Sequence, residues 1–335
     1  MANKIFPTME DYEKKDDFFK IDVECHLVGH REYISYFPGV KQWWQGIAGV
    51  ARPLTYPMSP EQLKLQVKEK PEELIEFLDK YGVDMACLIP ESMMDTTGYA
   101  CRWTSNGEIS AVCEQYPDRL ISIPNVGPIK MRGKHALWEL EYLVTERNAK
   151  MIKFYPPEDT YMNDEAIYPF YEKLVELKVP VAIHTGFCWV PPGRSKYCDP
   201  MLLDDVATDF PELTIIAFHA GWPYPHVLNL CAAAHPNIYI GLNLLIPWAI
   251  VSPRRFAEIL GEAYRYVGPD RIVWGTDCAG FEVQIWAAVE GFRDFQIPED
   301  MQEEYGYPNL TEEDKAKIFG LNMARVLNIK PERRV

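Results

Sequence analysis

The sequence lacks the features that would place it in several broad classes of protein. Its eight cysteines include no Cys-x-x-Cys pair, and several lie inside apolar runs, so we expect buried free thiols in a reducing compartment rather than a disulfide framework. The first 20 residues contain no apolar run of signal-peptide length, and no later segment is apolar enough to cross a bilayer. We therefore expect a cytoplasmic protein without a membrane partner.

Positive charge is also scarce, with 34 Lys and Arg against 49 Asp and Glu, a net charge of −15. This balance argues against nucleic acid or an anionic membrane surface as the main partner. A small anionic substrate stays compatible with it, because a metal ion and one or two arginines can reverse the local field in a cleft. Low-complexity tracts and linkers are absent, and we interpret residues 1–335 as a single domain.

Eight short runs, apolar nearly throughout, recur along the chain. This composition is typical of strands that are buried on both faces of a parallel sheet. From the second run onward they recur about every 30 residues, the length of one strand–helix unit. The runs cover residues 19–26, 84–90, 120–126, 149–154, 179–184, 213–219, 237–243 and 271–277.

The segments between the runs have helical patterns, as residues 71–80 and 165–177 illustrate. Eight alternations of strand and helix predict an α/β fold, a closed (β/α)8 TIM barrel, with a doubly wound open sheet as the alternative. Residues 27–70 interrupt the rhythm and are rich in aromatics, Pro and Gly. They fit an insertion after the first strand, which in a barrel would lie over the carboxyl-terminal mouth.

Potential metal ligands stand at the carboxyl ends of four of the eight predicted strands. Because side chains alternate along a strand, Glu24 and His26 should face the same way and Cys25 the opposite way. In a parallel barrel all strand ends meet at one rim, so ligands distant in sequence converge there. Imidazole and carboxylate groups suit zinc, manganese, iron or another borderline divalent ion. The other strand-end candidates are His184, His219 and Asp277.

Five segments in a fixed order resemble the amidohydrolase-related family typified by aminocarboxymuconate-semialdehyde decarboxylase and the aromatic acid decarboxylases. The resemblance covers most of the chain, and the set is specific in its order and spacing although each motif alone is modest. The segments are residues 22–26 (DVECH), 180–186 (PVAIHTG), 218–221 (FHAG), 271–277 (RIVWGTD) and 310–325.

The resemblance implies that Glu24, His26, His184 and Asp277 bind one divalent ion. We expect this ion to be zinc or manganese, with iron or magnesium as alternatives. His219 would then support a ligand or act as the catalytic base, a role that suits a side chain whose ordinary pKa lies near neutrality. Asp277 could instead relay a proton, which competes with its ligand role because a ligand must be ionised. The resemblance also implies a homodimer.

Lys153 ends the fourth predicted strand. In binuclear relatives of the wider superfamily, a carboxylated lysine from this strand bridges two metal ions. Here we favour a plain lysine that attracts an anionic substrate or packs along the strand.

Two enzymatic interpretations follow. The first is nonoxidative decarboxylation of an aromatic or conjugated carboxylic acid, with the metal as Lewis acid. The second is hydrolysis or hydration of a C–C, lactone or amide bond by a metal-bound hydroxide. The aromatic acid decarboxylases of this family usually carry a Glu three residues after the histidine of strand six, where it orients the imidazole. This chain has Trp222 at that position, so another acid such as Glu91 or Asp199 would have to take over this role. A binding protein that has lost its chemistry would be expected to lack a ligand, and all four are present.

The candidate substrate contacts also follow predicted strand ends or lie in the inserted segment. Arg52 and Arg194 are candidates for bidentate capture of a carboxylate. Trp189 and Trp222 would line an aromatic pocket, and Asn243 at the end of strand seven could donate a hydrogen bond to substrate.

Overall fold

The computed structural model describes residues 16–27, 70–90, 104–188, 193–278 and 282–335. All strand pairs in this part of the chain are parallel and join strands that follow one another in the sequence. The strands are β1 (Ile21–Cys25), β2 (Met85–Leu88), β3 (Leu120–Ser122), β4 (Ile152–Phe154), β5 (Val181–His184), β6 (Ile215–Phe218), β7 (Ile238–Gly241) and β8 (Ile272–Val273).

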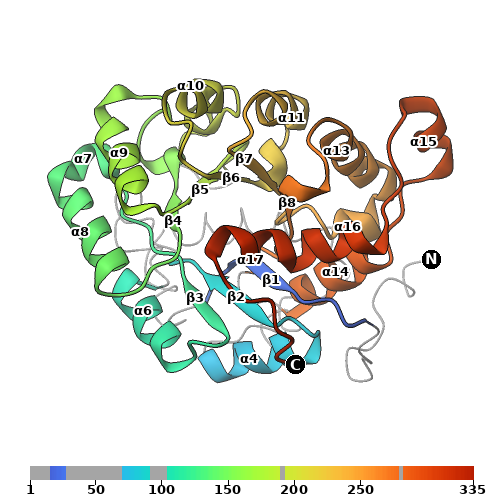
Figure 1. Cartoon of the computed structure of the whole chain (residues 1–335), viewed down its shortest axis with the longest axis horizontal. Coiled ribbons are helices and arrows are strands. Elements are labelled where there is room, and N and C mark those ends of the chain that lie inside the picture. The colour runs from blue at the N-terminus through green and yellow to red at the C-terminus, as the bar shows by residue number, and fades with distance from the viewer. Residues whose placement is uncertain (1–15, 28–69, 91–103, 189–192, 279–281) are drawn as a thin grey trace.

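The strands close into a ring through two isolated bridges (Figure 1). Cys25 pairs with Cys278 where β8 meets β1, and Asn125 pairs with Lys153 where β3 meets β4. At the second junction Lys153 also donates its backbone N–H to the carbonyl of Pro124 at 2.8 Å. The predicted (β/α)8 barrel is therefore confirmed. The doubly wound alternative is wrong, because it would require the strand order to reverse at a switch point.

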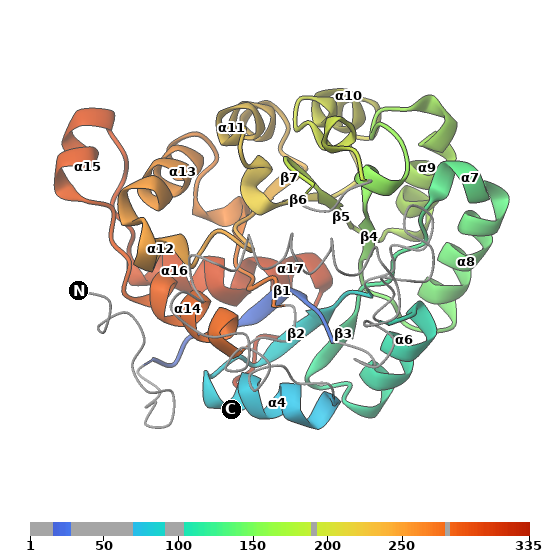
Figure 2. The same cartoon turned by 180° about the vertical axis from the view of Figure 1, so that it is seen from behind.

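The helices surround the ring, as both views show (Figure 2). The predicted helix at residues 71–80 is confirmed as α4, which begins at Pro71, a residue well suited to the first helical position, and buries an apolar face on the barrel. The helices are α4 (Pro71–Lys80), α6 (Asn106–Gln115), α7 (Ile129–Arg132), α8 (Lys134–Thr145), α9 (Tyr168–Leu177), α10 (Leu202–Asp209), α11 (Pro225–Ala234), α12 (Trp248–Val251), α13 (Pro253–Tyr266), α14 (Glu282–Arg293), α15 (Glu299–Tyr305), α16 (Glu312–Ala316) and α17 (Asn322–Leu327).

The buried apolar side chains form two clusters, one inside the ring and one between the strands and helices. The inner cluster takes alternate residues of the strands and extends to Met323, Ala324 and Leu327 of α17, which crosses the centre of the ring in Figure 1. The outer cluster joins the remaining strand residues to the surrounding helices. Because α17 covers the amino ends of the strands, the carboxyl ends are the side at which polar side chains gather.

A β-bulge in β1 decides which of its side chains face the interior. The pairing of β1 with β2 shifts register between Asp22 and Cys25. Val23 belongs to the inner cluster, whereas Cys25 belongs to the outer one. Because of the bulge, the side chains of Val23 and Glu24 both face the interior of the barrel. Strict alternation would have placed these two neighbours on opposite faces of the strand.

All eight predicted strands are present, each shorter than its apolar run. Residues 28–69 of the predicted insertion lie outside the described residues, so its place over the mouth stays a prediction. Within the part of the chain that the structure describes, no helix is long and apolar enough to span a membrane.

Candidate metal centre

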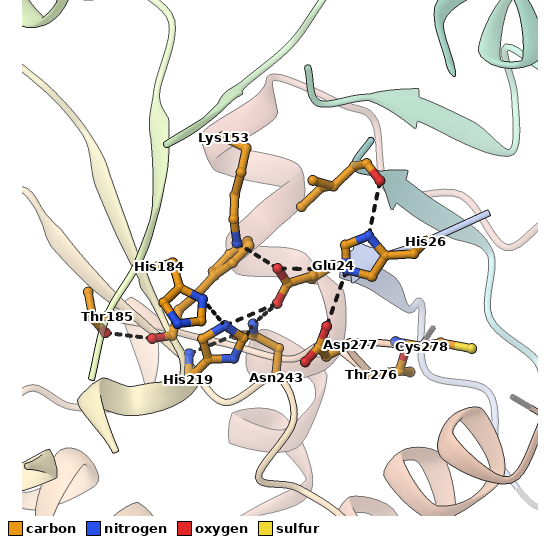
Figure 3. Close-up of polar contacts among 12 residues, drawn as sticks. Glu24, His26, Lys153, His184, Thr185, His219, Asn243, Thr276, Asp277 and Cys278 are labelled. Atoms are coloured by element: carbon orange, nitrogen blue, oxygen red, sulfur yellow. Dashed lines mark hydrogen bonds and ion pairs between the residues drawn. The ribbon is translucent and has the colours of Figure 1, made fainter. Parts of the chain in front are cut away.

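Three of the four predicted ligands meet at the carboxyl end of the barrel. Glu24, His26 and Asp277 each offer one ligand atom, and these atoms all lie within 4.8 Å of one another. Glu24 and His26 come from the end of β1, and Asp277 follows β8, the neighbouring strand of the ring. The predicted convergence of the first and last strands is thus observed. Figure 3 shows the cluster with its surrounding side chains.

The ring of His26 is oriented for a cation by the carbonyl of Ile89. Nδ1 of His26 lies 3.0 Å from the Ile89 oxygen, so that Nδ1 carries the proton and donates it. Nε2 then keeps its lone pair and points at Oδ1 of Asp277, 3.2 Å away. A metal-ligating histidine usually donates its other ring N–H to a carbonyl or carboxylate, as Nδ1 of His26 does here, and this leaves Nε2 for an ion.

Asp277 owes its position to the backbone after β8. Its φ is 51°, in the left-handed region that residues other than Gly, Asn and Asp rarely adopt. Its N–H donates to the carbonyl of Glu24 at 2.9 Å, which ties the loop to β1. Burial, and next the charge of Glu24, raise the pKa of the Asp277 carboxyl to about 7. A divalent cation between the two carboxylates would reverse this shift by favouring both ionised forms.

Asp22, two residues before Glu24 in β1, supports the same junction between β1 and the segment after β8. It accepts hydrogen bonds from the backbone N–H of Thr276 at 2.8 Å and from its hydroxyl at 2.5 Å. It also accepts one from the N–H of Glu24 at 3.2 Å, which holds the bulge. Sequence reasoning assigned Asp22 no role, although a carboxylate inside an apolar strand was a signal for one.

Glu24 is held by two side chains from across the barrel. The ammonium of Lys153 in β4 lies 2.6 Å from Oε1 of Glu24, and it also lies over the ring of Phe218, 4.0 Å from its centre. The side-chain amide of Asn243 donates to the other oxygen, Oε2. Glu24, Lys153 and Asn243 are each at most 3% exposed. The carboxylate therefore points inward in a fixed orientation, with its charge partly balanced.

The two strand-end histidines form a chain of hydrogen bonds with Asn243. Nε2 of His219 lies 2.9 Å from Nδ1 of His184, and Nε2 of His184 lies 3.1 Å from the carbonyl of Phe187. The Asn243 amide nitrogen lies 3.2 Å from Nδ1 of His219. These contacts agree with one set of protons, in which both histidines carry theirs on Nε2 and Asn243 donates to His219.

Burial lowers the pKa of both imidazoles below the ordinary value, so His184 and His219 are neutral at pH 7. His184 lies beside the cluster of three ligand atoms and is not part of it. To bind an ion, His184 would have to exchange one of its two hydrogen bonds for the metal. Its ligand role stays a prediction.

The predicted substrate contacts are only partly placed. Arg52 and Trp189 lie outside the described residues. Arg194 is exposed and begins a 3-10 turn, and its backbone N–H donates to Pro157. Trp222 is half-buried and packs edge to face on Trp248, with ring centres 5.6 Å apart. Asn243 is the predicted contact that lies inside the site, where it engages Glu24 and His219.

The position three residues after His219 holds Trp222 rather than an acid, and the structure shows what contacts the imidazole instead. Nδ1 of His219 faces the amide of Asn243. Asp199, one of the two possible replacements, is exposed and accepts from the N–H of Met201. Glu91, the other, lies outside the described residues. An amide therefore occupies the place at which a carboxylate was expected.

Comparison with known proteins gives a family match over most of the chain. The sequence family described as Amidohydrolase matches residues 95–329. Among curated proteins, Protein fluG of Emericella nidulans is 29% identical over 142 residues, which is 41% of this chain and 16% of that protein. The match thus spans about a sixth of that protein's length.

Solved structures share the fold at low sequence identity. A 5-carboxyvanillate decarboxylase from Novosphingobium aromaticivorans, solved with manganese, has a TM-score of 0.62 at 16% identity, covering 95% of this chain and 100% of that one. A 2,6-dihydroxybenzoate decarboxylase from Rhizobium has a TM-score of 0.64 at 14% identity, covering 93% and 99%. The 4-oxalomesaconate hydratase of Rhodopseudomonas palustris has a TM-score of 0.56 at 19% identity, covering 92% and 96%.

Proposed function

This chain belongs to the amidohydrolase family of metal-dependent enzymes, and we propose that it decarboxylates an aromatic or conjugated carboxylic acid without an oxidant. The observation that carries the proposal is the cluster of Glu24, His26 and Asp277, whose ligand atoms lie within 4.8 Å of one another beside a buried lysine. Structural neighbours that decarboxylate 5-carboxyvanillate and 2,6-dihydroxybenzoate support it.

The donor set fits one divalent ion. Two carboxylates and one imidazole are present, and His26 already presents a lone pair to Asp277. We propose His184 as the fourth ligand and zinc or manganese as the ion, since both accept mixed nitrogen and oxygen donors. When bound, the ion would supply Lewis acidity that draws electrons from the reacting acid.

Lys153 would attract the substrate carboxylate into the site. Lys153 is 3% exposed, and its ammonium borders the ligand cluster through Glu24. In a buried site such a charge acts at short range with little screening, which counters the net negative charge of the chain. Trp222, which follows β6, packs edge to face on Trp248, and we propose that this pair forms an apolar wall for the ring of the substrate.

In the reaction the bond between ring carbon and carboxylate breaks, CO2 leaves, and the ring carbon takes up one proton. His219 would deliver that proton as an imidazolium, after taking up the proton that a hydroxyl of the substrate releases, because a neutral imidazole with its one proton on Nε2 is too weak an acid to give it up. Asp277 is the second candidate donor, in competition with its role as a ligand. A substrate lying beside the cluster would replace the contact between His219 and His184.

Hydrolysis or hydration is the second candidate. The hydratase of Rhodopseudomonas palustris shares the fold, and the amide of Asn243 rather than a carboxylate faces His219. A reaction in which water attacks a C–C, lactone or amide bond does not need an acid at the position of Trp222.

One assay separates the two candidates. The protein loaded with manganese or zinc is incubated with a panel of hydroxybenzoates while released CO2 is measured, and in parallel with lactones and amides while ring opening or amine release is measured. We expect CO2 from a hydroxybenzoate, lost in His26→Ala and kept in His226→Ala, a matched change of an exposed histidine. Turnover of a lactone or amide alone would overturn the decarboxylase proposal in favour of the hydrolase.

A further inference from the structure

A cavity lies at the amino end of the barrel, on the side of the ring opposite the metal centre. It has a volume of about 360 Å³ and lies between α6, β3 and the loop before β4, with the C-terminal tail at its edge. Met85 and Leu120, the first residues of β2 and β3, are part of its wall, which places it at the opposite ends of strands whose carboxyl ends face the site.

Two serines in the wall of this cavity have hydroxyls without a hydrogen-bond partner. Ser110 on α6 is 1% exposed and Ser122 at the end of β3 is 5% exposed. Neither Oγ has a partner among the described residues, and the same is true of Nε of Arg334. Buried polar groups almost always find a partner, so these three atoms mark a part of the fold beside the cavity where polar groups are incompletely paired.

The charge around the cavity is opposite in sign to that of the whole chain. Three cationic side chains, Arg147, Lys150 and Arg334, line it, with Glu114 as the carboxylate among the lining residues. Glu114 is paired with Arg147 at 2.7 Å. Lys150 has no ion pair in the described part of the chain, and the contact of Arg334 with Asp118 is long at 3.7 Å. Two cations are thus available to a ligand, in a chain whose net charge is −15.

Much of the remaining wall of the cavity is apolar, which favours a ligand with an apolar body. Apolar side chains cover the space between the two serines and the cationic edge: Met85, Cys113, Pro117, Leu120, Ile121 and Ile329. A pocket with apolar walls and a few placed polar groups is typical of a small-molecule site. We propose that this cavity binds a small molecule with an apolar body and a carboxylate, the carboxylate facing Lys150 and Arg334. This site does not depend on the proposed reaction.

Octanoate is a suitable probe, with 1-octanol as its uncharged counterpart. Isothermal titration of the metal-loaded protein should give saturable octanoate binding, with octanol at least about tenfold weaker because it lacks the charge-assisted hydrogen bonds. The double variant Lys150→Gln/Arg334→Gln should weaken octanoate about tenfold. The matched control is Lys134→Gln/Arg254→Gln, which changes an exposed lysine and an arginine paired with Asp300 elsewhere on the surface. It should bind octanoate as the unchanged protein does.

A third variant, Ser110→Leu, fills the space between α6 and β3 and should abolish octanoate binding, with circular dichroism confirming that the fold is kept. Equal octanoate affinity in the Lys150/Arg334 variant and in the unchanged protein would overturn the proposal, because binding would then occur elsewhere, the metal centre included. The absence of saturable binding would also overturn it and would mean that the cavity holds water only.

Discussion

The ammonium of Lys153 lies 2.6 Å from Oε1 of Glu24, although 129 residues separate them in the sequence. The pair joins β4 to β1 through the interior of the barrel, and both residues are at most 3% exposed. An ion pair in such a place is sensitive to the loss of either member, because the remaining charge is left buried. Lys153 therefore sets the orientation and charge of a predicted metal ligand from the far side of the ring.

Replacing Lys153 with Met should lower both metal affinity and activity by about 10- to 100-fold, because Glu24 loses the partner that orients it. Metal content after dialysis and kcat/KM would be measured on the same preparation. Lys153→Arg should recover part of the metal affinity by restoring the charge. If Lys153→Met keeps full metal content and full activity, Lys153 does not position Glu24.

Metal removal should lower thermal stability, because an ion that binds only the folded state stabilises it. At a metal concentration of about 100 times Kd the gain is about 2.7 kcal/mol. Unfolding temperatures would be compared after chelation and after adding back zinc or manganese. His26→Ala should abolish the metal-dependent rise, whereas His226→Ala, at an exposed histidine, should preserve it. A rise that persists in His26→Ala would place the ion elsewhere.

Gly186 permits a close approach between the segments that follow β5 and β6. Its φ is +89°, and a Cβ there would lie 1.9 Å from the carbonyl oxygen of Trp222. Gly186→Ala should destabilise the fold by about 3 kcal/mol through this clash and the unfavourable φ.

Gly268 offers a control without the clash. Its φ of +82° and ψ of 166° also favour glycine, but nothing lies within 4 Å of its Cβ position, so Gly268→Ala should cost only the backbone strain, about 1–2 kcal/mol. Chemical denaturation would compare the two variants. Equal losses would show that the Trp222 contact adds nothing.

Asp164 should contribute stability that disappears in acid. Hydrogen bonds from Lys130 and Thr160, each 2.6 Å long, lower the pKa of its carboxyl to about 2 from 3.8. This contribution is full above pH 3.8 and is lost as pH falls toward 2. Solvent screening reduces it to about 1 kcal/mol. Asp164→Asn should therefore be less stable than the unchanged protein at pH 6 and equal to it near pH 2, whereas the exposed Asp17→Asn should match it at both.

The pattern of the sequence predicted the barrel because strands that are buried on both faces consist of short runs that are apolar nearly throughout. Eight apolar runs at regular spacing can be satisfied by parallel strands covered with helices, and all eight strands are present. The alternation in β1 also placed Glu24 and His26 on one face correctly. It could not reveal the bulge between Asp22 and Cys25, because a register shift depends on the neighbouring strands and on Thr276.

Asn243 illustrates the limit at the candidate site. Its position at the end of strand seven suggested contact with substrate, but its amide is engaged by Glu24 and His219. Which partner a strand-end side chain takes depends on distances across the ring, and no local pattern encodes these. The same holds for Lys153, whose partner Glu24 lies on another strand. The predicted homodimer stays a prediction.

The sequence by itself determined the order of strands and helices and the residue types at the strand ends, because hydrophobic periodicity and side-chain chemistry are local properties. Only the tertiary structure decided which of those end residues touch. It brought Asp277 to His26 through a backbone with positive φ, and it set Lys153 against Glu24 across the interior. Closure of the ring turns separate strand ends into one site, since contact between distant residues is a property of the closed ring and not of any segment.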